Sequence, residues 1–454
     1  MHELADRLAA DRFLSDPLIA ERATSYWNCA PMQAKSLLLP RTTGDVAEIL
    51  RWCHASGQTI VTQGGLTGCV AGAESTKEDM VVSLEKMNGI IEIDTVGGTA
   101  IVEAGAVLQT VQETVAEHGL YFPLDLGARG SCTIGGNVAT NAGGINVLRY
   151  GMMRNLVLGL EAVLADGTVV SSMNRMLKNN AGYDVKQLFI GTEGTLGVVT
   201  KAVLRLFPQP ASRQDSLVAM TSFANVSNFL RYLQQQLGGN LSAFELMWGD
   251  YFEAVTGEGG HRAPLPRDYP LYVVLQAEGS DPGADDERFE VVLSKALEYQ
   301  LIVDAVIPKS AAEADAIWDI RENFEAVLEP APVYLYDVSL PIRDMDEYVS
   351  RVKANVTKRW KHGRCYTIGH VADGNLHFFV KPFEQGDFHR ASDECVYEPL
   401  GRIGGSVSAE HGIGIDKLEW LPHSRSAEEI ALMRTLKKSL DPKNLLNPGR
   451  VLTP

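Results

Sequence analysis

Three glycine-dense runs constrain the fold of this chain more than any other feature of its sequence. They span residues 63–68, 131–144 and 191–197. So many small residues cannot pack a core among themselves, but they can form a wall on which a large flat ligand lies against the backbone. The second run also carries Ile134 and Val138, which flexible loops rarely contain. The chain is therefore predicted to build a ligand-binding surface from glycine-rich walls.

The first run follows a short predicted strand over residues 59–62. A strand that ends in a glycine-rich loop can aim backbone N–H groups at phosphates. The run is neither a G-x-G-x-x-G fingerprint nor a Walker loop, because no Gly-Lys-Ser/Thr follows. Its residues alone leave two interpretations open, a phosphate-binding loop and an ordinary turn.

A second signal lies between Gly369 and His377, where two histidines flank an Asp-Gly turn. Strand-like runs on both sides predict a hairpin that brings His370 and His377 towards one point. Further along the chain, Glu410 and His411 offer a third ligand and a spare imidazole. Two imidazoles and a carboxylate leave one position open, as catalytic zinc requires. The alternative for the two histidines alone is a turn with two packed side chains.

Length and composition limit the classes of protein that fit. A chain of 454 residues is too long for one core, so two or three domains are expected. A net charge of −16 argues against nucleic acid and anionic membranes as partners. The first residues show no signal-peptide pattern, and no run of about eighteen apolar residues occurs. The six cysteines show no C-x-x-C spacing, which favours a cytoplasmic protein with reduced thiols.

The order of the predicted elements indicates the domain boundaries. A helical lead over residues 1–33 begins a first domain, which ends at residue 210 after a proline-rich run. From 211 to 426 strand-like runs alternate with helices, which predicts an α+β domain with helices on one face of an antiparallel sheet. Residues 427–454 are predicted to form a tail that docks back on the first domain.

Six motifs follow one another along the chain, at residues 123–127, 134–144, 191–197, 369–377, 408–414 and 446–449. In this order they resemble the FAD-linked oxidoreductases of the vanillyl-alcohol-oxidase superfamily. Within it the chain is most similar to the D-2-hydroxyacid dehydrogenase branch, which includes D-2-hydroxyglutarate and D-lactate dehydrogenases. The resemblance implies an α+β protein in which a two-subdomain FAD-binding domain precedes a cap domain that carries the metal site.

The resemblance also implies that FAD binds without a covalent bond. Related proteins with covalent flavin often use a histidine in the first glycine loop, and this chain has Gln63 there. The pyrophosphate is expected on that loop, and the isoalloxazine along the later walls and the tail. The residues expected to contact FAD are Gln63, Gly64, Gly65, Leu66, Thr67, Gly68, Pro123, Leu124, Asp125, Ser131, Thr133, Ile134, Gly135, Gly136, Asn141, Gly144, Glu193, Gly194, Gly197, Val198 and Asn447.

For the chemistry, the resemblance supports His370, His377 and Glu410 as ligands of a divalent metal, expected to be Zn²⁺, and His411 as the catalytic base. A metal-bound hydroxyl has a lowered pKa, so that an imidazole can take its proton while hydride leaves for flavin N5. The alternative for His411 is a residue that orients Glu410.

Arg321 matches the family arginine that holds the substrate carboxylate. Its guanidinium can donate two parallel hydrogen bonds to a carboxylate, as a bidentate pair. The alternative is a charge on a helix surface, paired with Glu322 or Glu325.

The expected substrate pocket differs from that of the hydroxyglutarate enzymes. Those enzymes have a threonine, a lysine and an asparagine at positions that match Glu325, Leu335 and Phe379. Loss of the lysine removes a partner for a substrate oxygen, and Glu325 would repel a second carboxylate. The substrate is therefore predicted to be a D-2-hydroxyacid with a neutral side chain, such as D-lactate or D-mandelate. The alternatives are D-2-hydroxyglutarate, and an alcohol oxidase that uses O₂ without a metal.

The electron acceptor expected from the resemblance is electron-transfer flavoprotein, a quinone or a cytochrome, and a soluble carrier is favoured. The sequence leaves open whether the chain forms a homodimer. A non-catalytic flavin subunit is a competing interpretation, but such a subunit should lack the metal residues that this chain carries.

Overall fold

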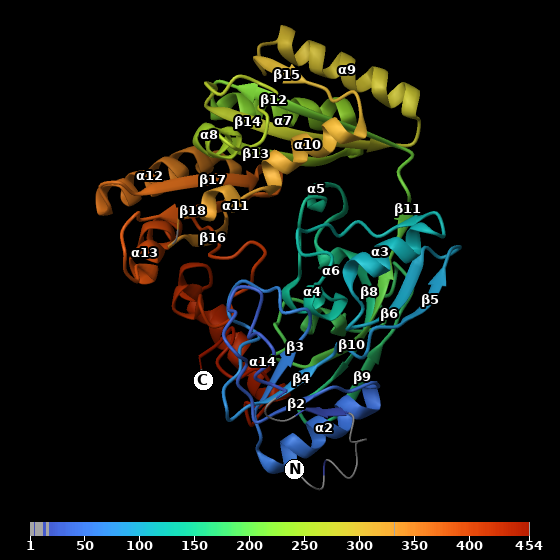
Figure 1. Cartoon of the computed structure of the whole chain (residues 1–454). Coiled ribbons are helices and arrows are strands. Elements are labelled where there is room, and N and C mark those ends of the chain that lie inside the picture. The colour runs from blue at the N-terminus through green and yellow to red at the C-terminus, as the bar shows by residue number, and fades with distance from the viewer. Residues whose placement is uncertain (1–3, 5–11, 15–17, 331, 454) are drawn as a thin grey trace. The chain divides into compact units, whose positions relative to one another are not determined.

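The computed structural model describes residue 4 and residues 12–14, 18–330 and 332–453. These residues divide into two compact units (Figure 1). Of the described residues, unit 1 contains those up to 144, together with 151–209 and 410–453, and unit 2 contains those within 145–150 and 210–409.

The boundary at the end of the second domain differs from the predicted one. Residues 410–426 were assigned to the cap, but in the structure they belong to unit 1. The reason is a set of hydrogen bonds within unit 1. Glu410 accepts the backbone N–H of Gly144, and Glu193 accepts those of Ile413 and Gly414.

Unit 1 is built on two main sheets, in agreement with the expected two-subdomain fold. The four-stranded sheet has the order β1 (Phe13–Leu14), β2 (Ser36–Leu38), β4 (Met80–Ser83) and β3 (Ile60–Gln63), and its last three strands are parallel. The antiparallel sheet has the order β5 (Ile90–Asp94), β6 (Thr99–Glu103), β10 (Val198–Arg205), β8 (Val157–Val163) and β9 (Val169–Ser172). A short pair joins β7 (Leu120–Tyr121) to β11 (Phe207–Pro208).

The first helix along the chain that Figure 1 labels is α2 (Thr43–Ser56), which begins with a capping box. The Thr42 hydroxyl accepts the Asp45 N–H, and the Asp45 carboxylate accepts the Thr42 N–H. Apolar residues of the helix, such as Leu50, then pack against the four-stranded sheet. The other helices of unit 1 include α3 (Leu108–Ala116), α4 (Ile134–Thr140), α6 (Met153–Leu156) and α14 (Ala427–Leu440).

The predicted helical lead over residues 1–33 lies partly outside the described residues. Over residues 18–33 it forms turns and a bridge between Ala23 and Pro31 instead of a helix. Two of its apolar side chains, Ile19 and Met32, pack against the four-stranded sheet. Turns suit this segment because proline and short polar residues interrupt its apolar spacing.

Unit 2 is organised by one antiparallel sheet of seven strands. Their order is β15 (Asp304–Val306), β12 (Ser212–Met220), β14 (Leu271–Gly279), β13 (Leu241–Trp248), β17 (Arg364–His370), β18 (Asn375–Lys381) and β16 (Tyr334–Ser339). Every pair of neighbours runs antiparallel, as the expected cap fold requires.

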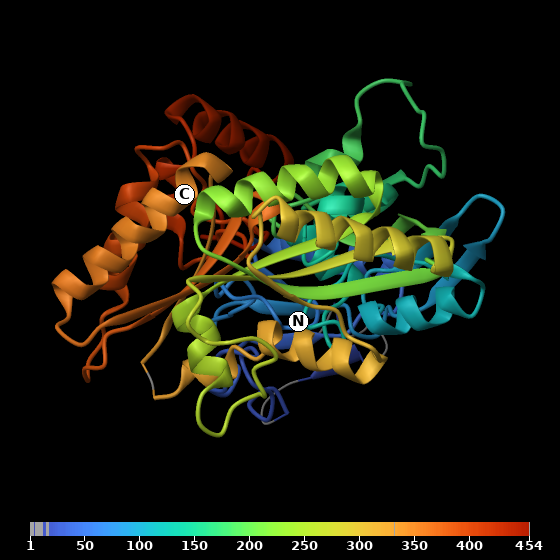
Figure 2. The same cartoon turned by 90° about the horizontal axis from the view of Figure 1, so that it is seen from above.

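Helices cover both faces of this sheet, whereas the sequence predicted one covered face. One face carries α8 (Gly249–Thr256), α10 (Ala311–Glu322) and α11 (Glu325–Leu328). The other carries α7 (Phe223–Leu237), α9 (Pro282–Glu298), α12 (Met345–Arg359) and α13 (His389–Leu400), and Figure 2 shows α7 and α9 lying across the strands. The reason is that β13 and β14 are buried on both faces, so each face needs a cover.

Within the described part of the chain, no helix combines the length and the apolar character that crossing a membrane needs. The short helix α5 (Val147–Tyr150) belongs to unit 2, where it packs against β13.

Candidate functional site

One face of the unit 2 sheet gathers the two predicted histidine ligands. The expected hairpin is confirmed: β17 and β18 are joined by a turn in which Gly374 has a φ of 94°. Side chains alternate between the faces of a strand, so His370 and His377 point to the same side. In the strand register Glu245 lies opposite His370, and Asp337 lies opposite His377.

These four side chains lie close enough to act together. The rings of His370 and His377 have centroids 5.3 Å apart. A ligand atom of His377 lies within 4.8 Å of one on His370, and the same holds for His377 and Asp337. Nδ1 of His370 lies 2.7 Å from Oε1 of Glu245. A carboxylate can only accept, so Nδ1 carries the proton, and in the neutral imidazole Nε2 is then the nitrogen that can bind a metal.

Arg321 is buried near the end of α10 and points into the same cluster. Its Nε and Nη2 both lie 2.9 Å from Oε2 of Glu245. It therefore pairs with Glu245 and not with the neighbours Glu322 or Glu325 that the surface interpretation required. The edge of the guanidinium that carries Nη1 lies outside this pair and still has the fork geometry that a carboxylate matches.

Glu245 was missed by the sequence reasoning, although a charged residue within the apolar run of β13 was a signal. Burial acts to raise the pKa of Glu245. The nearby His370 and Arg321 outweigh burial, so that the pKa is lowered from its usual range and the carboxylate is ionised.

Two of the expected substrate-pocket residues lie beside the histidines on the same sheet face. Leu335 and Phe379 are directly opposite each other, and each lies two residues along its strand from Asp337 or His377. The Phe379 ring stacks with Tyr251 and Phe324, at centroid distances of 6.3 and 6.0 Å.

This part of the face is therefore apolar. Leu335 is 36% exposed and can meet a ligand, while Phe379 is buried. Glu325 begins α11 with an exposed side chain.

Asp337 was also not predicted, and it fixes the chain just before Glu410. Its buried carboxylate accepts hydrogen bonds from Asn375 Nδ2 at 2.9 Å, from the Ser408 hydroxyl at 3.0 Å and from the Ala409 N–H at 3.0 Å. The next residue, Glu410, is the first of unit 1 in this stretch.

In unit 1, one carboxylate oxygen of Glu410 accepts the Gly144 N–H. This contact joins the segment that carries Glu410, the third predicted metal ligand, to the second glycine-dense run. His411, which follows it, is partly buried.

The glycine walls of unit 1 lie against one another. The N–H groups of Gly191 and Glu193 donate to the carbonyls of Val138 and Ala139 in α4, at 3.0 and 2.8 Å. A Cβ at Gly65 would collide with the carbonyl of Ser131 in the second run, so this glycine is required by the close approach of two backbones.

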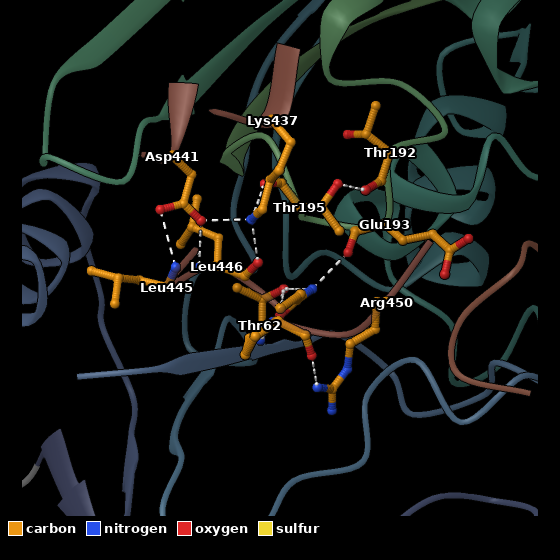
Figure 3. A network of polar contacts seen from close by, with 11 residues as sticks. Thr62, Thr192, Glu193, Thr195, Lys437, Asp441, Leu445, Leu446 and Arg450 are labelled. Atoms are coloured by element: carbon orange, nitrogen blue, oxygen red, sulfur yellow. Dashed lines mark hydrogen bonds and ion pairs between the residues drawn. The ribbon is translucent and has the colours of Figure 1, made fainter. Parts of the chain in front are cut away.

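The tail completes this assembly (Figure 3). Asn447 accepts the Thr62 N–H at 2.8 Å and donates to the carbonyl of Glu193 at 2.6 Å. Lys437 of α14 donates to the carbonyl of Thr195 at 2.9 Å. The C-terminal segment therefore joins the strand before the first glycine run to the third run.

Several residues expected to contact FAD use their side chains to hold the walls. Gln63 donates to the Ala73 carbonyl at 2.9 Å. Asn141 accepts the Arg154 N–H at 2.9 Å. The Glu193 carboxylate accepts two N–H groups from residues 413 and 414. These three side chains are therefore engaged by groups of the protein itself.

The walls nevertheless fit a cofactor such as FAD. A Cβ at Gly68 or Gly127 would meet no atom within 4 Å, so open space adjoins these two backbones. Leu66 has a φ of 57°, the left-handed conformation that occurs in backbone nests for phosphate groups. The same walls contain most of the other expected contacts, namely Gly64, Thr67, Thr133, Ile134, Gly135, Gly136, Gly144, Gly194 and Gly197. Pro123, Leu124, Asp125 and Val198, which were also expected to contact FAD, lie just outside the three runs.

Comparison with known proteins places these features in context. Residues 34–172 match the family described as FAD binding domain, and 209–451 match FAD linked oxidases, C-terminal domain. The chain is 40% identical over 451 residues to D-2-hydroxyglutarate dehydrogenase, mitochondrial, of Bos taurus. The aligned residues cover 98% of this chain and 82% of that protein. The chain is 38% identical to D-2-hydroxyglutarate dehydrogenase of Xanthomonas citri pv. viticola, over 94% of this chain and 90% of that one. Among solved structures, p-cresol methylhydroxylase with substrate bound has a TM-score of 0.77 at 16% identity, covering 99% of this chain and 95% of that one.

Proposed function

Because the chain belongs to the FAD-linked oxidases of the vanillyl-alcohol-oxidase type, in the branch of the D-2-hydroxyglutarate dehydrogenases, we propose that it oxidises a D-2-hydroxyacid to the 2-oxoacid with a divalent metal as second cofactor. One observation supports the metal: His370 donates its Nδ1 proton to Glu245 beside His377, so that the other ring nitrogen is the one that can serve as a ligand. Histidines that bind metals are commonly oriented in this way.

The proposed ligands are His370, His377 and Glu410, which follows the Ala409 held by Asp337. Zn²⁺ suits two imidazoles and a carboxylate. When bound, it supplies a Lewis acid for the hydroxyl, and FAD supplies the hydride acceptor.

The remaining roles belong to side chains of this chain. Arg321 binds the substrate carboxylate with the guanidinium edge that Glu245 leaves free. The imidazole of His411 takes the hydroxyl proton.

We further propose that the substrate lacks a second carboxylate, as in D-lactate or D-mandelate. The apolar pair Leu335–Phe379 beside the histidines supports this choice, because it offers no cation to a second acid group. D-2-hydroxyglutarate is the second candidate, favoured by the names of the relatives. The soluble electron acceptor, the homodimer and the cytoplasmic location stay predictions.

Anaerobic bleaching of the flavin absorbance tests the function directly. The holoprotein is mixed with D- and L-isomers of lactate, mandelate and 2-hydroxyglutarate, before and after metal removal by a chelator. We expect rapid bleaching by the D-isomers of lactate or mandelate, loss of bleaching after chelation, and recovery on addition of Zn²⁺.

Preference for D-2-hydroxyglutarate would replace the proposed substrate and leave the reaction class intact. Full activity after chelation, with O₂ as acceptor, would favour a metal-independent oxidase.

A further inference from the structure

We propose that Glu245 is a positioning residue that holds the metal ligand His370 and the substrate-binding Arg321 with one carboxylate. This inference rests on the proposed function, since it concerns how the same site keeps its shape. It adds a residue that contacts neither metal nor substrate and acts through two that do.

The geometry of the three side chains carries the argument. Glu245 lies on β13, His370 on β17 and Arg321 on α10, so the cluster joins two strands and a helix of unit 2. Oε1 of Glu245 lies 2.7 Å from Nδ1 of His370, and Oε2 lies 2.9 Å from both Nε and Nη2 of Arg321. Each carboxylate oxygen therefore serves one of the two functional residues.

Burial makes the arrangement rigid. Glu245 is 1% exposed, and Arg321 and His370 are each 7% exposed. The strand register sets Glu245 directly opposite His370, so backbone pairing fixes their separation. The OH of Tyr251, on α8, also donates to the carbonyl of Arg321 at 3.1 Å, which ties down the end of α10.

Stability alone does not explain a charged cluster at this place. The other residues of β13 are uncharged, and its neighbours on this face include the apolar Met247 and Val274. Well-packed apolar side chains are often at least as stabilising as a buried ion pair. The cluster does fix two orientations that the proposed reaction needs: that of the His370 ring, and that of the guanidinium plane of Arg321.

Replacement of the carboxylate by an amide, Glu245→Gln, tests the role. In the metal-free holoflavoprotein, Zn²⁺ and Co²⁺ affinities are measured by competition with a chelator. We expect about a 10–100-fold loss of affinity, the range found when a partner that orients a metal ligand is removed. The visible absorption bands of bound Co²⁺ should change, and the KM for the 2-hydroxyacid should rise because Arg321 loses its fixed orientation.

A matched control is Asp215→Asn. Asp215 is also a buried carboxylate of the sheet, and it accepts the Trp318 Nε1–H of α10 at 2.8 Å and Gln276 Nε2 at 2.9 Å. It ties the same helix to the same sheet but contacts neither His370 nor Arg321. We expect this variant to melt at a lower temperature and to bind metal like the wild type.

Two results would overturn the inference: Glu245→Gln binds metal with wild-type affinity and KM, or Asp215→Asn loses as much metal affinity as Glu245→Gln. If Glu245→Gln does not fold, Glu245→Asp replaces it. That variant keeps the charge but is one methylene shorter, so unchanged metal affinity would contradict the role. Wild-type protein that binds no metal, yet bleaches with D-2-hydroxyacids, would instead overturn the metal part of the proposed function.

Discussion

At the scale of single residues, we predict that Leu335 decides which substrate side chain is accepted. It is partly exposed, on the face that carries Asp337 and His377. A lysine there could keep its ammonium hydrated and still reach a second carboxylate. Leu335→Lys should therefore raise kcat/KM for D-2-hydroxyglutarate relative to D-lactate by roughly 10–100-fold, equivalent to about 1.4–2.8 kcal/mol.

Steady-state kinetics on both acids measure this ratio. Leu335→Gln is the control, because it adds polarity and length without charge. An unchanged ratio in Leu335→Lys would mean that this residue does not contact the substrate side chain.

Glu193 predicts a pH dependence of stability. Burial raises the pKa of its carboxyl from 4.5, against the lowering effect of the N–H groups of Ile413 and Gly414 and of Lys417. The folded state then holds a proton that the unfolded state releases, so the free energy of unfolding falls as the pH rises above about 4.5. Urea unfolding at several pH values should show a shallower fall in Glu193→Gln, and equal slopes would contradict the prediction.

At the scale of elements, the hairpin of β17 and β18 presents both histidines. The first strand can approach the start of the second only because residue 369 is a glycine. A Cβ at Gly369 would collide with the carbonyl of Asn375 and press on Leu376. We expect Gly369→Ala to destabilise unit 2 by about 1–3 kcal/mol, the range for overpacked sites, and to weaken metal binding because His370 is displaced.

Denaturant unfolding and metal titration measure the two effects. Gly239→Ala is the matched control, since a Cβ there meets no atom within 4 Å. Equal stabilities of the two variants would show that the hairpin tolerates the side chain.

The segment from 311 to 328, whose apolar spacing by itself indicates one helix, shows how a neighbour can interrupt a local pattern. It is divided into α10 and α11 at Asn323, which has a ψ of 60°. The interruption accompanies the stacking of Phe324 on Phe379. A long-range contact of this kind is absent from the local periodicity that predicted a single helix.

At the scale of the whole molecule, the tail of unit 1 joins segments that are far apart in the chain. Asn447 satisfies Thr62 N–H and the carbonyl of Glu193, and it is itself buried. Asn447→Ala leaves both groups without this partner, which should lower the free energy of unfolding by about 1–3 kcal/mol. FAD should dissociate more readily, because the strand and the glycine wall are no longer tied together.

Thermal unfolding and the fluorescence of released FAD report the two effects. Ser439→Ala, which removes only a hydroxyl on α14 that donates within its own helix, is the control. FAD retention equal to the wild type would show that the tail does not support the cofactor wall.

The sequence by itself determined the local features of this protein: the glycine walls, the capped helix after Thr42 and the turn that brings His370 and His377 together. Each depends on backbone preferences within a few residues, which a local pattern records. Only the tertiary structure decided that Glu245 lies opposite His370, that α10 brings Arg321 to it, and that helices cover both sheet faces. The physical reason is that strand register and helix packing select partners 76 and 125 residues apart, and no local pattern encodes that choice.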